Sequence, residues 1–450
     1  MCLPTRAKTA RSGGNKETLL AMEFEKSRTL RIVAVIAILA LTTWILAALF
    51  SHGPEYSLVS SSRVPVESET FLKQVEPLVN SKVTSNNQIE VFPNGENFYE
   101  AELASLRQAQ RSINIEAYIF HRGQVTRRLL EVLAERARAG VKVRLVVDAL
   151  GSFSTSKRYF KPLTQAGGHI EWYHPLRWNN WFRSNNRTHR EMIVVDGSTA
   201  FVGGAGFADW WRLPQGSHPR WRDTMFRVQG DAALHVQGTF VENWLETSGE
   251  ILNGDDYFPL LSRDPGRTPT MVVVSTPSAG GSTRSRILFE TLIGAARKSI
   301  YINTPYFLPD RGMQQELVRA VKRGVTVKII VPGKHGDHSL TRSSGRAAYG
   351  DLLKAGAGIY EYDASMIHCK IMIIDGVWSV VGSTNLDNRS FGINDEVNLA
   401  ALDSAVASRL TQDFEQDLSH SERQTLEAWN KRSLYERALE SIGWVLENQQ

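Results

Sequence analysis

The pattern of apolar and polar residues occurs twice along the chain. In the first copy, a helical stretch at 98–110 leads into alternating apolar residues that begin at Ile113. In the second copy, a helical stretch at 286–297 leads into a similar alternation that begins at Ile300. A further helix and an apolar strand follow in both copies, and these strands lie at 140–148 and 324–332. Strands that alternate with helices predict two α/β domains, and near-duplicate halves are expected to pack around a pseudo-twofold axis.

Polar stretches rich in Pro, Gly and Ser mark the borders of these halves. A C-terminal capping box at Ser433 predicts a closing helix with one apolar face. The predicted organisation is a linker at 51–85, a first domain at 86–261, a junction at 262–269, a second domain at 270–420 and a C-terminal amphipathic helix at 421–450.

The segment Ile32–Phe50 has 19 residues and no charge. A helix of this length spans roughly the 30 Å apolar core of a bilayer, so we expect one N-terminal transmembrane helix. A cleaved signal peptide is the competing interpretation, but the apolar run is longer than a usual signal core.

The net charge of +5 is concentrated before this segment, because residues 1–31 hold seven basic and three acidic residues. The basic flank predicts a cytoplasmic tail at 1–31 and a body on the outer side of the membrane. Beyond the tail the chain is nearly neutral, which argues against a nucleic-acid partner. Neither Cys2 nor Cys369 has a partner at metal-ligand spacing, and strand alternation predicts that Cys369 is a buried packing residue.

Chemically useful side chains gather in the second half. His368 and Lys370 alternate onto one face of a predicted strand, and Asp375-Gly376 predicts a hairpin turn after it. The return strand is expected to bring Gly382 back beside His368, followed by Ser383 and Asn385. An imidazole, an ammonium and neutral hydrogen-bond donors are the groups that phosphodiester chemistry requires.

The first half carries the same frame around His189. Both histidines precede an aspartate by seven positions, Asp196 or Asp375, and a glycine by fourteen, Gly203 or Gly382. A single histidine on an apolar strand is usually a packing residue, but two at equivalent points of a repeat indicate catalysis. The two aspartates are explained by their turns and are expected to be structural.

This duplicated pattern, HxKxxxxD followed by GSxN, resembles the phospholipase D superfamily. The sequence around these motifs is most similar to cardiolipin synthases, and the stretches that carry this similarity are Thr304–Asp310, Trp221–Asp223 and Asn394–Asn398. The resemblance implies two mixed-sheet sandwich domains whose histidines meet at their interface. It also implies a phosphohistidine intermediate, with His189 as the nucleophile and His368 as the acid, and no metal or cofactor.

Further roles follow from the same resemblance. Asp223 and Glu396 match the acidic residues that hydrogen-bond the two histidines. The implied reaction transfers a phosphatidyl group between molecules of phosphatidylglycerol, an anionic phospholipid, to give cardiolipin and glycerol. The implied location is a cell membrane, the bacterial inner membrane, with a single-pass anchor and the catalytic body on the periplasmic side.

The first motif departs from the family pattern at Glu191, where a lysine is expected, and at Gly206, where an asparagine is expected. A carboxylate there would repel a phosphate unless it is paired or tilted away, so we expect Arg220 or Arg222 to compensate for it. The expected phosphate ligands are Lys370, Ser383 and Asn385, with the backbone amides of Gly203 and Gly204.

Other functions remain open from the sequence. A phospholipase D hydrolase or another phosphatidyl exchange enzyme differs only in the acceptor of the intermediate. A superfamily nuclease is disfavoured by the nearly neutral body, and an inactive lipid-binding scaffold by the intact second motif. The tryptophans at 178–181 and at Trp210-Trp211 suit either a bilayer interface or packing within loops.

Overall fold

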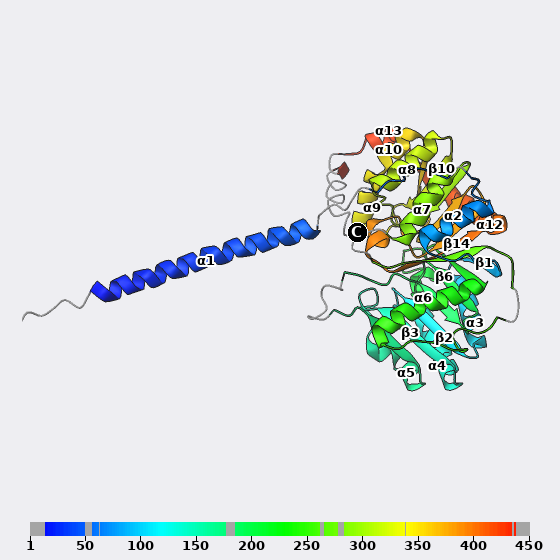
Figure 1. Ribbon diagram of the computed structural model, residues 1–450, viewed down its shortest axis with the longest axis horizontal. Helices are drawn as coiled ribbons and strands as arrows, with labels where there is room; N and C mark the ends of the chain where they lie inside the picture. Colours follow the sequence, from blue (N-terminus) through cyan, green and yellow to red (C-terminus); the bar gives the residue numbers. More distant parts are fainter. Residues whose placement is uncertain are drawn as a thin grey trace, which may run out of the picture. The chain divides into compact units, whose positions relative to one another are not determined.

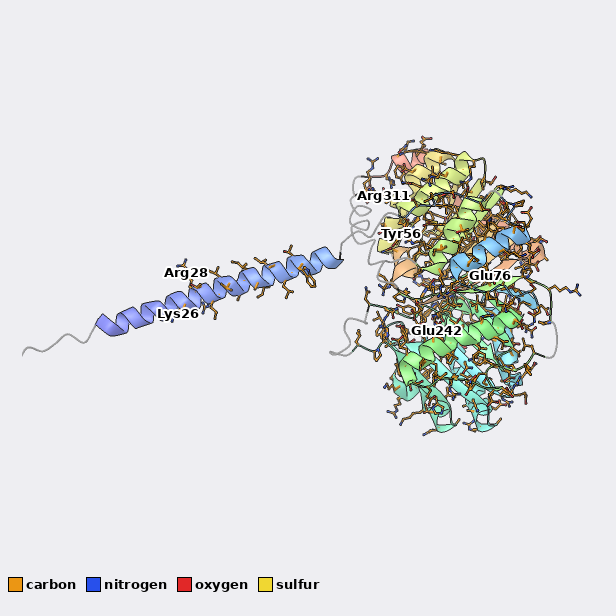
Figure 2. All side chains as sticks on the ribbon, viewed as in Figure 1. Lys26, Arg28, Tyr56, Glu76, Glu242 and Arg311 are labelled. Carbon is orange, nitrogen blue, oxygen red and sulfur yellow. The ribbon has the colours of Figure 1, made fainter. Side chains whose placement is uncertain are left out.

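The computed structural model describes residues 14–49, 56–62, 64–176, 185–261, 265–277, 283–337, 339–433 and 436–437. The chain divides into two compact units, Met1–His52 and Gly53–Gln450. Helix α1 (Gly14–Leu49) makes up the described part of the first unit. Apolar side chains such as Ile32, Leu39 and Trp44 are exposed along this helix, and the drawn side chains project around it (Figure 2).

Among the described residues, no helix is both long enough and apolar enough to cross a membrane. The transmembrane helix predicted at 32–50 is therefore not confirmed. Phe50 and the side chains of 45–49 lie outside the described residues.

The second unit contains two mixed sheets. The first has seven strands in the order β1-β7-β6-β5-β2-β3-β4. Strands β2, β3 and β4 run parallel to their neighbours in this group, whereas the remaining pairs are antiparallel. The strands are β1 (Asn87–Pro93), β2 (Ser112–Ala117), β3 (Lys142–Asp148), β4 (His169–Tyr173), β5 (Met192–Val195), β6 (Thr199–Gly203) and β7 (Thr224–Gly230).

The second sheet repeats this order and adds one edge strand. Read from β8, its order is β8-β14-β13-β12-β9-β10-β11-β15. The strands are β8 (Thr270–Ser275), β9 (Ser299–Asn303), β10 (Thr326–Pro332), β11 (Gly358–Tyr362), β12 (Ile371–Ile374), β13 (Trp378–Gly382), β14 (Glu396–Leu402) and β15 (Ser421–Gln424). The predicted α/β fold with two mixed sheets is confirmed, and strands occur where the repeat predicts them.

Helices cover the sheets of both halves (Figure 1). The first half has α3 (Gly95–Gln108), α4 (Gln124–Arg138), η1 (Lys157–Phe160), α5 (Lys161–Gln165), η3 (Asp209–Trp211) and α6 (Asp231–Ser248). Helix α2 (Glu69–Val79) precedes the first half in sequence but packs with the second half. The other helices of the second half are α7 (Arg284–Ala295), α8 (Arg311–Lys322), α9 (Ser339–Ala347), α10 (Tyr349–Ala355), α11 (Asn388–Gly392), α12 (Ser404–Ser419) and α13 (Leu426–Asn430).

Three hydrophobic clusters hold these layers together. One packs α3 and α4 on the first sheet, and another packs α2, α7 and α8 on the second. The third lies between the halves, because it contains Val194 and Val202 of the first sheet together with Ile371 and Val381 of the second. Helices α6 and α12 also contribute to this central cluster, for example through Phe240. The surface where the two sheets meet is therefore a continuous core.

The two motif aspartates have the same structural position. Asp196 and Asp375 have φ of 52° and 53°, in the left-handed region that Asp tolerates, and each is followed by a glycine with positive φ. The Asp375 carboxylate accepts hydrogen bonds from the backbone of Arg297, Lys298 and Ser299 at 2.7–3.1 Å. Asp196 accepts equivalent bonds from residues 110–112. Each aspartate thus fixes its hairpin to the start of the neighbouring strand.

Two predicted segments are corrected. Part of the linker at 51–85 forms helix α2, which Ser68 caps by accepting a hydrogen bond from the Phe71 amide and which buries Phe71, Val75 and Val79. The region at 421–450 opens with strand β15, which pairs with β11, and with the short helix α13. Residues 434–435 and 438–450, which hold most of the helix expected after the Ser433 capping box, lie outside the described residues.

Candidate active site

The two histidines lie just before their hairpin strands, in extended segments that pair with the other half of the fold. The His189 amide donates to the carbonyl of Asp395 at 2.9 Å. The His368 amide donates to the carbonyl of Arg222 at 2.7 Å. Isolated parallel bridges, Thr188 with Asp395 and Arg222 with Ile367, accompany these bonds. Each histidine is therefore positioned by backbone from the opposite half.

The side chains cross between the halves in the same way. His189 Nδ1 lies 3.1 Å from both carboxylate oxygens of Glu396, the first residue of β14. His368 Nδ1 lies 2.9 Å from Asp223 Oδ2, immediately before β7. Both carboxylates are fully buried. A carboxylate on Nδ1 fixes the imidazole tautomer and makes Nε2 the nitrogen that can react.

Lys370 joins the two pairs into one site. Its Nζ lies 2.9 Å from His368 Nδ1 and 3.0 Å from Nε2, and it donates to the His368 carbonyl at 3.0 Å. Burial lowers the pKa of Lys370, and the nearby carboxylates of Asp223, Glu396 and Glu191 act in the opposite direction. Carboxylates from both histidine pairs thus act on the same ammonium group.

The two histidines have different surroundings. His368 packs against the indole rings of Trp211 and Trp221, with ring centroids at 5.6 and 5.4 Å. Burial and the Lys370 ammonium lower the pKa of His368, whereas its hydrogen bond with Asp223 opposes this shift. His189 instead contacts the ring of Tyr118 edge-on at 5.4 Å.

The predicted phosphate ligands have different structural positions. Ser383 Oγ donates to Glu396 at 2.5 Å and accepts from the Val397 amide at 3.0 Å, so it holds the carboxylate that holds His189. Asn385 is buried, and its Oδ1 has no hydrogen-bond partner among the described residues. A side chain at Gly204 would lie 2.9 Å from the His368 carbonyl and 2.9 Å from Lys370 Cδ, so the absence of a Cβ allows Lys370 this position.

Three details of the expected site are corrected. The Gly203 amide donates to the Glu191 carbonyl at 3.3 Å, so the strand ladder uses the amide that was assigned to phosphate. Gly382 lies beside Lys370 rather than His368, since its amide donates to the Lys370 carbonyl. Neither arginine compensates for Glu191, because Arg222 pairs with Asp417 at 2.9 Å and Arg220 pairs with Glu96.

Sequence reasoning missed the aromatic side chains around the histidines. Trp221 was noticed only as part of a family motif, and Tyr118 not at all. Trp211 is fully buried and donates from Nε1 to Asp223 Oδ2 at 3.2 Å, which makes it part of the site and not of a bilayer interface. The tryptophans at 178–181 lie outside the described residues.

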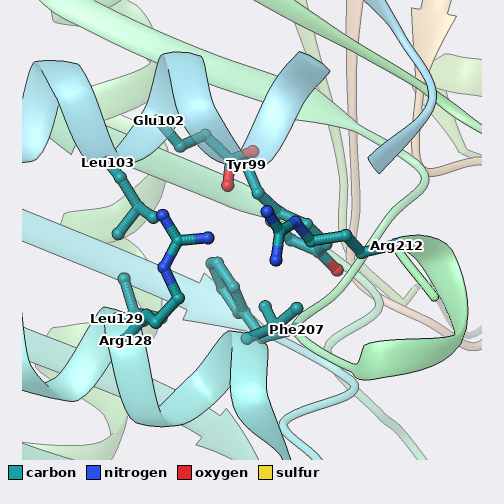
Figure 3. A pocket seen from close by; sticks show the side chains of 8 residues that line it. Tyr99, Glu102, Leu103, Arg128, Leu129, Phe207 and Arg212 are labelled. Carbon is teal, nitrogen blue, oxygen red and sulfur yellow. The ribbon is translucent and has the colours of Figure 1, made fainter. Parts of the chain in front are cut away.

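A small hollow outside the histidine site lies between α3 and α4 (Figure 3). Tyr99, Glu102, Arg128 and Arg212 line it together with apolar side chains. Burial raises the pKa of Glu102 well above its usual range. The Tyr99 hydroxyl lies 2.6 Å from the Gly206 carbonyl and donates to it, which connects this hollow to the wall of the site.

The chain is similar to known proteins. The family described as "Cardiolipin synthase, PLD-like domain" matches residues 103–212 and 289–418, more than half of the chain. This chain belongs to the cardiolipin synthase family. Among its relatives, the major cardiolipin synthase ClsA of Bacillus subtilis is 34% identical over 367 residues, which cover 81% of this chain and 75% of the relative. A cardiolipin synthase of Oceanobacillus iheyensis is 35% identical over 364 residues, with the same coverage.

A solved structure shares the fold of this cardiolipin synthase family member. The phosphatidylserine synthase of Haemophilus influenzae superposes with a TM-score of 0.66 at 14% sequence identity, covering 84% of this chain and 99% of that one. The resemblance to cardiolipin synthases inferred from the motifs is therefore confirmed by the family match and the relatives.

Proposed function

We propose that the protein is a phosphatidyltransferase that makes cardiolipin and glycerol from two molecules of phosphatidylglycerol. The observation that carries this proposal is the pair of buried histidine–carboxylate contacts, His189 with Glu396 and His368 with Asp223, around the Lys370 ammonium. Two imidazoles with fixed tautomers supply a nucleophile and a general acid at the same phosphorus atom. The relatives named as cardiolipin synthases support the choice of lipid substrate.

The reaction proceeds in two balanced steps. Nε2 of one histidine attacks phosphorus and forms a P–N bond, while the P–O bond to glycerol breaks and the other histidine protonates the leaving oxygen. That second histidine then takes the proton from a headgroup hydroxyl of another phosphatidylglycerol. The resulting oxygen attacks phosphorus, forms the new P–O bond and releases the first histidine.

Recognition of the phosphate is assigned mainly to the second half. In this proposal Lys370 supplies positive charge, the Asn385 amide supplies a neutral donor, and the backbone of Gly204 adds another from the first half. Ser383 is assigned to positioning instead, because its hydroxyl is bonded to Glu396. The strand ladder removes Gly203 from this set.

The membrane assignment is also part of the proposal. Helix α1 exposes apolar side chains between Leu30 and Trp44, which supports an apolar environment for this part of the predicted segment 32–50. Leu150, Phe153 and Leu176 are exposed on loops that follow β3 and β4. We assign the protein to a cell membrane, the bacterial inner membrane, with residues 1–31 inside and the catalytic body on the periplasmic side. Alkaline phosphatase fused at the C-terminus should then be active, and activity in a β-galactosidase fusion instead would reverse the orientation.

Lipid product analysis tests the activity. Wild type and His368→Ala, both solubilised in detergent, are offered phosphatidylglycerol and the products are identified by mass spectrometry. Cardiolipin from wild type alone supports the proposal. Phosphatidic acid as the sole product identifies a hydrolase, and the absence of turnover in both proteins favours a nuclease or an inactive scaffold.

A further inference from the structure

Glu191 and Gly206 differ from their counterparts in the second half, and the structure shows how they fit together. Glu191 stands two residues after His189, as Lys370 stands two residues after His368. Its carboxyl group is buried, and Oε1 accepts hydrogen bonds from the amides of Tyr118 and Ile119, both at 3.2 Å. These amides follow β2 and fix the direction of the carboxyl group.

Gly206 provides the space for this arrangement. A Cβ at position 206 would lie 2.8 Å from Glu191 Oε1 and 2.6 Å from the Ile119 carbonyl oxygen. The Gly206 carbonyl is held in place by the Tyr99 hydroxyl. An asparagine at this position, as the family pattern has, is incompatible with the observed carboxyl group. The two departures from the pattern therefore form one structural unit.

The second oxygen of the carboxyl group is unsatisfied. Glu191 Oε2 is buried and has no hydrogen-bond partner among the residues that the structure describes. Burial raises the pKa of Glu191 well above its usual range, whereas the Ile119 amide, the Lys370 ammonium and the Tyr118 amide oppose this shift. The charges of Lys370 and Asp223 act on it, and its own charge acts on the hydroxyl groups of Tyr118 and Tyr99.

An uncharged carboxyl group has one hydrogen to donate, and a buried donor without an acceptor is unfavourable. Because Oε1 already accepts two bonds, Oε2 is the oxygen that carries this hydrogen in the uncharged form. The described residues provide no acceptor for it, so we expect a bound molecule to provide one. The offset of Glu191 from His189 in the sequence matches that of Lys370 from His368, and the charges of Lys370 and Asp223 both act on the Glu191 carboxyl group.

We propose that Glu191 is a substrate-binding residue whose Oε2 donates a hydrogen bond to a nonbridging oxygen of the phosphodiester, while Oε1 stays fixed by the backbone. This inference rests on the proposed function of the site. Glu191 then gives the first half a neutral donor to the phosphate where the family pattern has a lysine. The same site already contains two carboxylates, those of Asp223 and Glu396.

Infrared difference spectroscopy on the full chain in detergent tests the proposal. The difference between wild type and Glu191→Gln should contain the C=O band of a protonated carboxyl group, and titration with inorganic phosphate should shift it to lower frequency. The matched control is Glu102→Gln, which identifies the band of a buried carboxyl group on α3 outside the site. That band should not move with phosphate.

A carboxylate band, an unshifted carboxyl band at saturating phosphate, or the absence of phosphate binding to wild type would overturn the proposal. Kinetics with a short-chain phosphatidylglycerol give a second readout. Glu191→Gln keeps both an acceptor and a donor, so its kcat/KM should stay within about threefold of wild type. Glu191→Met keeps the length of the side chain but has neither a donor nor an acceptor. Its kcat/KM should fall roughly tenfold, mainly because KM rises. Equal KM values for the Met variant and wild type would contradict a contact with substrate.

These results separate the inference from the proposed function. A shifted carboxyl band without cardiolipin formation would leave Glu191 as a phosphate ligand and remove the activity. Cardiolipin formation with an unmoved band would keep the activity and remove the role of Glu191.

Discussion

His189 lies 3.1 Å from both carboxylate oxygens of Glu396, although 207 residues separate the two in the chain. The reciprocal contact joins His368 to Asp223. Each catalytic candidate therefore depends on a carboxylate that the other half of the repeat provides. The dependence can be measured by changing the carboxylates while the histidines stay intact.

Glu396→Gln and Asp223→Asn should each lower kcat by roughly 10²- to 10⁴-fold, with little change in KM. An amide can donate to Nδ1 and stabilise the wrong tautomer, which places the proton on the reacting nitrogen. Steady-state kinetics with phosphatidylglycerol measure the effect. Ser383→Ala serves as a milder comparison because it loosens Glu396 without removing it. Unchanged kcat in both amide variants would exclude the proposed role of the carboxylates.

The identity of the nucleophile can be read from a trapped label. Burial and Lys370 lower the pKa of His368, which favours the neutral imidazole, the form that attacks phosphorus. With a substrate that has a good leaving group, we expect His189→Ala to accumulate phosphohistidine on His368. Mass spectrometry of peptides after an alkaline quench detects it. A label found on His189, in the His368→Ala variant, would support the opposite assignment that the family resemblance implies.

Removing the turn carboxylates should affect stability more than chemistry. Asp375→Ala leaves three backbone amides without their acceptor and places alanine at positive φ, which should cost about 1–3 kcal/mol. Calorimetry should show a lower Tm, with kcat per folded molecule unchanged. Asp375→Asn tolerates the same backbone and should lose less. Asp196→Ala should behave like Asp375→Ala, and a selective loss of kcat in either variant would indicate a catalytic role instead.

Glu116 should make stability fall as pH rises. Burial raises its pKa from the usual 4.5 to about 7, although Arg190 and the hydrogen bonds from Thr188 and Asn243 oppose this shift. Between pH 4.5 and pH 7 the folded chain therefore keeps a proton on Glu116 that the unfolded chain releases. The contribution of this proton to the free energy of unfolding is complete below pH 4.5 and lost above pH 7. The change amounts to about 3 kcal/mol.

The side chain in Glu116→Gln does not titrate, and its amide oxygen can still accept the hydrogen bond from Asn243. Urea unfolding at pH 5 and pH 8 measures the free energy of unfolding. Relative to wild type, this free energy should be higher for the variant at pH 8 than at pH 5, by up to about 3 kcal/mol. Parallel pH profiles for the two proteins would show that Glu116 does not titrate in this range.

Local patterns predicted the repeat, and the structure shows why other features were not predictable. The alternation of apolar residues around Ile113 and Ile300 reflects two buried strands, so the local sequence pattern is enough to predict them. The polar segment Ser421–Gln424 becomes a strand because β11 offers it an open edge, a tertiary effect without an apolar signal. Helix α2 did carry a signal, the Ser68 cap with apolar residues four apart, which the polar surroundings hid.

The site was predictable where motifs define it and not where packing does. The contacts of Glu396 and Asp223 with the histidines came from resemblance, since nothing local links positions so distant in sequence. The loss of Gly203 as a ligand follows from how far the β5–β6 ladder extends. The fit of Glu191 with Gly206 depends on the positions of Tyr118 and Ile119, which only the folded chain reveals.

The crossed histidine contacts also bear on the origin of the chain. A half-length ancestor carrying one histidine and one acidic residue could not have paired them within itself, because each contact spans the two repeats. Two identical copies related by a twofold axis would have formed both contacts at once. Fusion of the two genes would then have allowed each copy to change separately, and the present difference between Glu191 and Lys370 is the kind of divergence that a symmetric dimer could not have acquired on one side alone.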